Sequence, residues 1–296
     1  MSNGLPPHAV TVYALGSSKT SRSIKHGGGG AMAFDSSGNL YASNGAFDNG
    51  QISVYAAGTS KLLRRIRNIT DPYALVVDAQ AYLYVATFGA GVLVYGPGGT
   101  QTVHVIRKGT KGCSALAFDR ARNLYVANEW NGTVTVYAPG KTPGHPKLVH
   151  KIVGLHQPLA LAFGPSGNLF VANHKSVYVF KAGSLELLRT ITGITSAAAI
   201  AIDSIGRLYV SSDPFTREGY QPGWVTVYSA GGTKPLRKIT EGIDVPRAVI
   251  IDSSDNVYVA NSFNSSVTVY SPGGTKLVGT ITDGVTDPNF LAFNSK

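Results

Sequence analysis

The chain has 296 residues and a formal net charge of +10, with 26 lysines and arginines against 16 aspartates and glutamates. Its single cysteine, Cys113, excludes an intrachain disulfide and a zinc site built on several thiolates. No run of 18 apolar residues is present, and the first residues lack the charged and apolar regions of a secretory signal peptide. We therefore expect a soluble chain without a membrane span, and the native compartment stays undetermined.

The predicted elements are short strands rich in β-branched and aromatic residues, bounded by Gly, Pro, Asn and Asp. The chain starts with strands near 10–14 and 20–25, and then repeats a four-strand module of about 43 residues. The first strand of each module is an apolar run, and these runs end at Asp35, Asp78, Asp119, Gly164, Asp203, Asp252 and Asn294. The second strands lie at 39–44, 82–87, 123–128, 168–173, 207–212 and 256–261. The third strands lie at 10–16, 52–58, 92–98, 134–140, 177–183, 225–231 and 267–273.

A period near 40 with four strands per unit is typical of β-propeller blades. The first strand is apolar on both faces, with Leu116 and Phe118 on one and Ala115 and Ala117 on the other, which predicts burial between stacked blades. The fourth strand is an edge, and most of the Lys and Arg lie in it or in the turns beside it. We therefore expect the positive charge to be spread around the rim, and no nucleic-acid partner.

The number of blades depends on how the ring closes. The sequence carries six second strands but seven each of the other three kinds. The preferred interpretation is a single domain over 1–296 with seven four-stranded blades. Its composite closing blade is formed by pairing of the N- and C-terminal strands, from 8–25 and 290–294. The alternative is a six-bladed ring, which leaves about 30 residues over.

The module ALAFDxxxNLYVAN…VTVYxPGGT resembles the NHL-repeat and streptogramin B lyase-like propellers, a group related to gluconolactonases. The resemblance implies an extracellular or periplasmic protein, and a lyase or a lactonase that holds a divalent cation with Glu, Asp and Asn. None of the four glutamates lies on a first strand, and none lies two residues from a histidine, so the acid, base and metal set of such enzymes is not visible. The recurrent Asp residues are expected to accept backbone hydrogen bonds in the turns that follow them.

Candidate binding residues lie in the loops between second and third strands and between successive modules, which share one face of a propeller, here called the top face. These loops vary in length and chemistry, as functional loops on a rigid scaffold do. The candidates are Phe47, Phe88, Trp130, His156, His174, Phe215, Arg217, Tyr220, Trp224 and Phe263. For the aromatic rings there are two interpretations: they stack on a ligand, or they cap each blade against its neighbour. For the two histidines there are also two: they form a pair that acts as a base or as metal ligands, or they are simply solvated. A turn-capping role is expected for Asn44, Asn128, Asn173 and Asn261.

From these features we predict a monomeric, non-catalytic binding propeller whose top face takes a small molecule, a glycan or a peptide. No catalytic residue, metal site or cofactor is assigned. The alternative is a metal-assisted lyase or lactonase, and its divalent cation would lie on the axis. Its candidate ligands are Asp71, Asp213, Asp244, Asp287 and His156.

Overall fold

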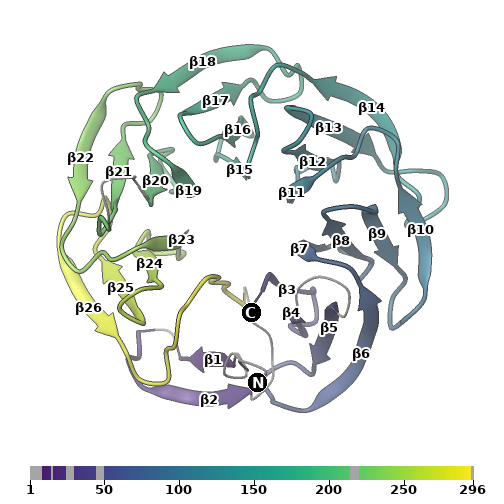
Figure 1. Cartoon of the computed structure of the whole chain (residues 1–296), viewed down its shortest axis with the longest axis horizontal. Coiled ribbons are helices and arrows are strands. Elements are labelled where there is room, and N and C mark those ends of the chain that lie inside the picture. The colour runs from purple at the N-terminus through teal and green to yellow at the C-terminus, as the bar shows by residue number, and fades with distance from the viewer. Residues whose placement is uncertain (1–8, 15, 25–29, 45–49, 214–219, 295–296) are drawn as a thin grey trace.

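A computed structural model describes residues 9–14, 16–24, 30–44, 50–213 and 220–294. In these ranges the chain consists of strands joined by turns, with no residue in a helix, and the strands form blades around a central opening (Figure 1). The prediction of an all-β propeller is therefore confirmed. A helix able to cross a membrane is also absent from this part of the chain.

Six blades are complete antiparallel sheets whose strands run from the channel outward in chain order. Blade 1 has β3 (Met32–Phe34), β4 (Leu40–Asn44), β5 (Gly50–Tyr55) and β6 (Leu62–Ile69). Blade 2 has β7 (Pro72–Val77), β8 (Leu83–Thr87), β9 (Gly91–Tyr95) and β10 (Thr102–Ile106). Blade 3 has β11 (Cys113–Phe118), β12 (Leu124–Asn128), β13 (Thr133–Ala138) and β14 (Lys147–Ile152).

The other three complete blades have the same order. Blade 4 has β15 (Ala160–Phe163), β16 (Leu169–Ala172), β17 (Ser176–Phe180) and β18 (Leu187–Thr192). Blade 5 has β19 (Ala197–Ile202), β20 (Leu208–Ser212), β21 (Trp224–Tyr228) and β22 (Pro235–Ile239). Blade 6 has β23 (Pro246–Ile251), β24 (Val257–Asn261), β25 (Ser266–Tyr270) and β26 (Leu277–Ile281).

The ring closes through a smaller unit, here called the closing module: β1 (Val10–Tyr13), β2 (Thr20–Ile24) and the segment 282–294. Six complete blades match the six-bladed alternative. The preferred count of seven four-stranded blades is not reached, because the closing module has only two strands among its described residues. The segment 290–294 forms no strand there, since the module offers no second strand against which its backbone could form a ladder. The two ends of the ring meet instead through hydrogen bonds from Thr11, Tyr13 and Thr20 to Asp283 and Gly284.

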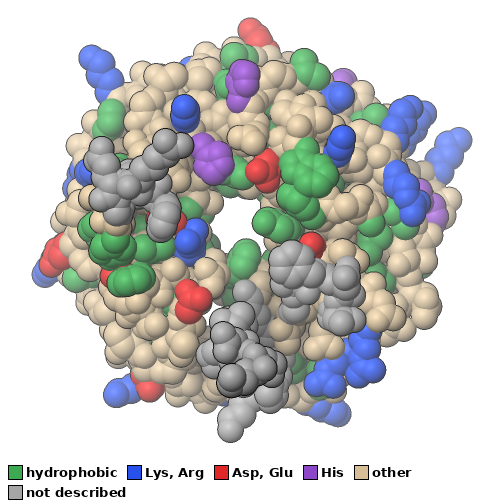
Figure 2. Space-filling view, viewed as in Figure 1, with side chains coloured by type: hydrophobic (Ala, Val, Ile, Leu, Met, Phe, Trp, Pro, Cys, Tyr) green, Lys and Arg blue, Asp and Glu red, His purple; other side chains and the backbone are tan. Residues whose placement is uncertain are grey.

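The hydrophobic core lies between the blades. Val94 of β9 and Val126 of β12, for example, are fully buried in one cluster that joins blades 2 and 3. The inner strands are less enclosed than their sequence predicted: Leu116 is buried, but Ala115, Ala117 and Phe118 are half-buried. The reason is that an innermost strand borders the open channel on one side (Figure 1). The outer strands are mostly exposed, and Figure 2 shows Lys and Arg side chains mainly around the periphery, as predicted.

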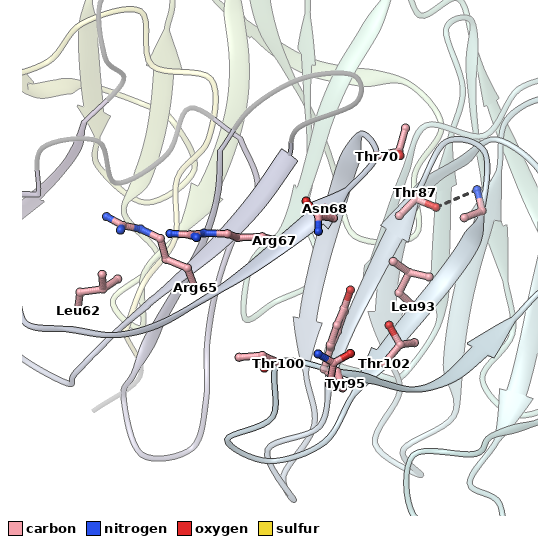
Figure 3. A pocket seen from close by; sticks show the side chains of 12 residues that line it. Leu62, Arg65, Arg67, Asn68, Thr70, Thr87, Leu93, Tyr95, Thr100 and Thr102 are labelled. Atoms are coloured by element: carbon pink, nitrogen blue, oxygen red, sulfur yellow. Dashed lines mark hydrogen bonds between the residues drawn. The ribbon is translucent and has the colours of Figure 1, made fainter.

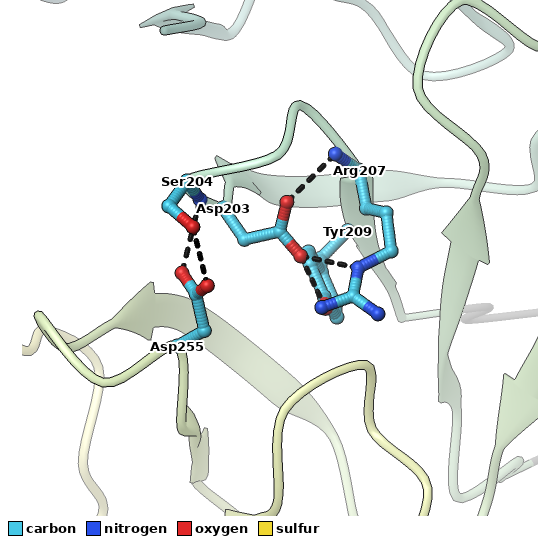
Figure 4. A network of polar contacts seen from close by, with 5 residues as sticks. All are labelled: Asp203, Ser204, Arg207, Tyr209 and Asp255. Carbon is cyan, nitrogen blue, oxygen red and sulfur yellow. Dashed lines mark hydrogen bonds and ion pairs between the residues drawn. The ribbon is translucent and has the colours of Figure 1, made fainter.

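A turn built on aspartate links the first two strands of the blades, as predicted. In blade 2 one carboxylate oxygen of Asp78 accepts the N–H groups of Gln80 and Tyr82, each at 2.9 Å. The other oxygen accepts the hydroxyl of Tyr84 at 3.4 Å. Blade 5 shows the most enclosed form, in which Asp203 also pairs with Arg207 (Figure 4). These recurrent aspartates therefore stabilise the scaffold, and they are not a metal site.

Candidate functional site

The residue that follows the six-residue second-strand repeat (82–87, 123–128, 168–173, 207–212 and 256–261) occupies equivalent positions around the mouth of the channel. Five blades place a described residue there, and we call this set the mouth ring: Phe88, Glu129, His174, Asp213 and Ser262. The N–H of Glu129 donates to the carbonyl of Gly112 at 2.8 Å, and the N–H of Asp213 donates to that of Ser196 at 3.0 Å. Because each acceptor lies directly before an inner strand, these contacts hold the mouth ring at the edge of the channel opening, which Figure 2 shows from this face.

Buried asparagines fix these loops from below. The side-chain oxygen of Asn128 accepts the N–H of Lys111 at 3.2 Å, and its amide nitrogen donates to the Thr135 hydroxyl at 3.1 Å. Asn261 repeats this arrangement with Asp244 and Thr268. The turn-capping role predicted for these asparagines is therefore confirmed at both positions. Rigid support of this kind is what keeps the mouth ring in place.

Three aromatic rings form a continuous cluster beside the mouth, over blades 2 and 3. Tyr73 stacks on Phe88 with ring centroids 5.5 Å apart, and Phe88 meets Trp130 edge-on at 4.3 Å. Trp130 also lies over Gly112, where an added Cβ would come within 2.6 Å of the indole. Tyr73 and Trp130 nevertheless keep 51% and 53% of their surface exposed. The cluster thus closes the junction between two blades and also presents rings to solvent, so ligand stacking by Phe88 and Trp130 stays a prediction.

A second aromatic pair lies over blades 5 and 6. The ring centroids of Tyr220 and Phe263 are 4.8 Å apart with the ring planes tilted by 33°, and Phe263 is 69% exposed. The Tyr220 hydroxyl donates to the carboxylate of Asp244, and this hydrogen bond raises the pKa of Tyr220 to about 12. Tyr220 is therefore protonated at neutral pH and serves to position Phe263.

One ion pair lies at the mouth. The guanidinium of Arg247, on the second residue of β23, is 3.0 Å from the carboxylate of Asp213. Asp213 is only 12% exposed and Arg247 is 47% exposed, so the carboxylate orients a cation that solvent still reaches. In the described part of the chain, Glu129 and His174 have no such ion partner. They are the titratable mouth-ring side chains that remain free to act on a ligand.

The other predicted site residues lie elsewhere. The Trp224 ring is covered by Lys238 of β22, whose ammonium nitrogen is 3.3 Å from the ring centroid, so it faces the outer strand of its own blade. His156 is exposed in a left-handed turn with φ of 47°, in a different loop from His174 of the mouth ring, so the structure does not support the predicted histidine pair. Phe47, Phe215 and Arg217 lie outside the described residues. Cys113 is fully buried, and burial raises the pKa of its thiol to about 12, as expected for an inert cysteine.

The donor set does not fit the divalent cation implied by the family resemblance. Within the described ranges no three His, Cys, Asp or Glu side chains are grouped to hold a metal ion. Of the candidate ligands, Asp213 is paired with Arg247 and Asp244 accepts from Tyr220. No step below is therefore assigned to a metal, and the expectation that no cofactor is needed stays a prediction.

Three residues of this site were not predicted from the sequence: Tyr73, Glu129 and Arg247. Asp213 was predicted as a cation ligand, whereas the structure pairs it with Arg247. The signal was nevertheless present, since aligning the six second-strand copies and reading the next residue gives the mouth ring. That position varies in chemistry, whereas the strand before it is nearly constant.

No protein family and no curated protein matches the chain by sequence. Among solved structures, a Lactobacillus plantarum protein superposes with a TM-score of 0.75 at 19% identity, over 91% of this chain and 89% of that one. A Bacteroides uniformis protein gives 0.74 at 17%, over 91% and 89%. A Bacteroides fragilis protein gives 0.74 at 16%, over 88% and 85%. Similarity at such identities establishes a shared propeller fold.

Both Bacteroides proteins carry the provisional name 6-phosphogluconolactonase. These names contradict the non-catalytic scaffold that the sequence favoured, and they agree with its alternative, a lactonase. The non-catalytic propeller was favoured because the sequence showed no set of acid and base residues. The mouth ring supplies such residues, since it places Glu129 and His174 at the channel opening.

Proposed function

We propose that this protein hydrolyses a sugar lactone at the mouth of its central channel. The observation that carries the proposal is the mouth ring, in which Glu129 and His174 occupy equivalent positions in adjacent blades. A cation, Arg247, and half-exposed aromatic rings stand around the same opening. The names of the two Bacteroides structures give the reaction class independent support.

Hydrolysis of a lactone needs a base, a positive group and a surface for the sugar. Water attacks the carbonyl carbon and gives a proton to the base, and the ring C–O bond then breaks as the base returns this proton to the ring oxygen, which leaves a hydroxyl group and a carboxylic acid that ionises to a carboxylate. His174 is the candidate base, because its imidazole is exposed at the mouth and histidine is the side chain that most often acts as a general base. Glu129, in the next blade, is the candidate partner that stabilises the resulting imidazolium. Arg247 would stabilise the oxyanion, and its orientation is already set by Asp213.

The substrate class follows from the surroundings of the mouth. Tyr73 and Trp130 offer ring faces on which the C–H face of a sugar stacks. Exposed Lys111 and Lys175 flank the same loops and favour an anionic substituent such as a phosphate. The proposal therefore covers sugar lactones with and without phosphate. Three further properties remain proposals that rest on the repeat sequence: a closer relation to NHL-repeat and streptogramin B lyase-like propellers, a monomeric state, and an extracellular or periplasmic location.

The test is a pH-indicator assay of glucono-δ-lactone and its 6-phosphate, with the spontaneous rate subtracted. We expect His174→Ala to lower kcat/KM by about 10²–10⁴-fold, and Glu129→Gln by a smaller factor, with Tm unchanged. His150→Ala is the matched control, because His150 is exposed on the outer strand β14, away from the mouth. Wild-type rates no higher than the spontaneous rate for both lactones would refute the proposal, as would equal effects of the His174 and His150 variants.

A further inference from the structure

A groove on the flank of the ring lies between blades 1 and 2, and its upper end reaches Thr87, the residue before Phe88 of the mouth ring. Its volume is about 760 Å³, within the range of sites that hold small molecules and short oligosaccharides. One wall comes from the outer strand β6, and the other comes from β9, from the start of β10 and from the turn between them (Figure 3).

The shape of β6 opens this groove. At eight residues it is longer than the outer strands of the other complete blades, which have five or six. Its register with β5 shifts between Gly50 and Ile52, and Asn68 there adopts a left-handed conformation with φ of 61°. A bulge of this kind bends a strand and redirects its side chains. Between blades 2 and 3, by contrast, the long turn before β14 packs against the neighbouring blade, with His145 centred 4.6 Å from His104.

Two arginines line the β6 wall. Because side chains alternate along a strand, Arg65 and Arg67 share one face, while Arg64 and the buried Ile66 share the other. Arg64 is held by the hydroxyl and ring of Tyr41. Arg65 and Arg67 are exposed and have no carboxylate partner in the described part of the chain. Figure 3 shows their side chains next to each other and pointing the same way, so the groove carries two uncompensated positive charges.

The opposite wall is polar and uncharged. Thr100, Gln101 and Thr102 are exposed there, above the buried ring of Tyr95 (Figure 3). Hydroxyl and amide groups both donate and accept hydrogen bonds, which is the chemistry that recognises sugar hydroxyls. Guanidinium groups bind planar carboxylates and sulfates through paired hydrogen bonds. Charge on one wall and neutral polar groups on the other suit a ligand that combines both kinds of group.

We propose that this interblade groove is a binding site for an acidic oligosaccharide, with Arg65 and Arg67 taking its carboxylate or sulfate groups and residues 100–102 its hydroxyl groups. None of these residues belongs to the mouth ring, so the proposal goes beyond lactone hydrolysis and is tested independently of it. Its role is to hold the protein on an acidic polysaccharide.

The experiment is titration calorimetry of the full chain with trigalacturonate and with a sulfated disaccharide, using maltotriose as the neutral sugar and inorganic sulfate as the free anion. We expect binding of at least one acidic sugar at about 150 mM salt, with maltotriose and sulfate at least about tenfold weaker. Arg65→Ala with Arg67→Ala should weaken that binding by at least about tenfold. Arg65→Lys with Arg67→Lys should restore only part of it, because lysine cannot form the paired hydrogen bonds.

The matched control is Lys147→Ala with Lys151→Ala. It removes the same charge from the outer strand of blade 3, where Lys151 faces Thr135 in the register in which Arg65 faces Ser53. All four side chains are exposed, so both double variants should keep the wild-type Tm. The proposal is overturned if neither acidic sugar binds, if sulfate alone binds as tightly as the sugars, or if the control variant loses as much affinity as the arginine variant.

Discussion

Replacing Asp203 with alanine should destabilise the fold more than the same change in any half-buried copy of its turn. The Asp203 side chain is fully buried and accepts the N–H of Arg207 at 2.8 Å, the Nε of Arg207 at 2.5 Å and the Tyr209 hydroxyl at 2.9 Å (Figure 4). Tyr209 itself is completely buried, and burial beside Asp203 raises its pKa, so the hydroxyl stays protonated. The substitution removes all three acceptor contacts and leaves the Tyr209 hydroxyl in a dry interior.

The magnitude follows from what is left without a partner. Breaking a buried ion pair on one side costs about 3–5 kcal/mol. The Arg207 side chain keeps 21% of its surface exposed and recovers part of that by hydration, so we expect about 3–4 kcal/mol here. Asp252 in blade 6 is the matched control, because it caps the same backbone turn but bonds to Asn256 at 2.9 Å and to Tyr258 at 3.3 Å, and it is half-buried. Asp252→Ala should cost about 1–2 kcal/mol.

Urea unfolding followed by circular dichroism measures both variants against the wild type. A difference of about 2 kcal/mol between them corresponds to about 3 °C in Tm, because the entropy of unfolding is about 2.1 cal/mol/K per residue in a chain of 296 residues. Both carboxylates accept hydrogen bonds from the backbone, from a side chain four residues on and from a tyrosine hydroxyl, so the difference mainly measures what the buried ion pair with Arg207 adds over the neutral hydrogen bond from Asn256. Equal losses for Asp203→Ala and Asp252→Ala would show that the buried ion pair adds nothing beyond the turn.

Two further predictions concern the aromatic cluster and the ring closure. Gly112→Ala should lower stability by about 1–2 kcal/mol and shift the tryptophan emission, because its φ is +62° and the new Cβ would lie 2.6 Å from Trp130. Gly154→Ala imposes the same backbone strain with no atom within 4 Å, so an emission shift in that control, or none in Gly112→Ala, would contradict the argument. The Thr20 N–H, 2.8 Å from the Asp283 carboxylate, holds the pKa of Asp283 below its ordinary value. Because the pKa is lower in the folded state, the contact stabilises the fold fully above the unfolded pKa of about 4 and is lost as the pH falls through the folded pKa. Asp283→Asn should therefore have a lower Tm than wild type at neutral pH and the same Tm near pH 2, and a gap of constant size in thermal scans would refute this.

The parts of the fold that could be predicted are those that repeat. An aspartate occupies the position of Asp78 in nearly every module, and this regularity correctly predicted that it caps the turn after the first strand. The structure of the closing module was harder to predict, because the repeat is incomplete there and the sequence has no second strand for it. The number of strands in the sequence indicated that the closing module lacks a second strand. It did not indicate that residues 290–294, with no neighbouring strand to pair with, would form no strand themselves.

The site depends on residues that depart from the repeat, and it was predicted only in part. Trp130 and Phe88 were found because aromatics stand out in loops, and they do meet beside the channel. Trp224 was included on the same ground, but the register at the start of β21 turns its ring toward Lys238. Arg247 was missed because its function depends on a partner from another blade, Asp213, and pairing across blades is not visible in a linear repeat.

The contact between a tyrosine of one blade and a phenylalanine of the next recurs around the ring. Tyr84 meets Phe118 edge-on at 5.3 Å, Tyr125 meets Phe163 at 5.0 Å, and in the closing module Tyr258 meets Phe293 at 5.1 Å. A chain of units that each touch only their neighbours behaves as a one-dimensional cooperative array. When such an array is joined into a circle it has no terminal unit from which unfolding can begin. Removing the Phe293 side chain together with the hydrogen bonds from Thr11, Tyr13 and Thr20 to Asp283 and Gly284 would open the circle, and we then expect the propeller to unfold progressively from that break, as an open solenoid does from its ends.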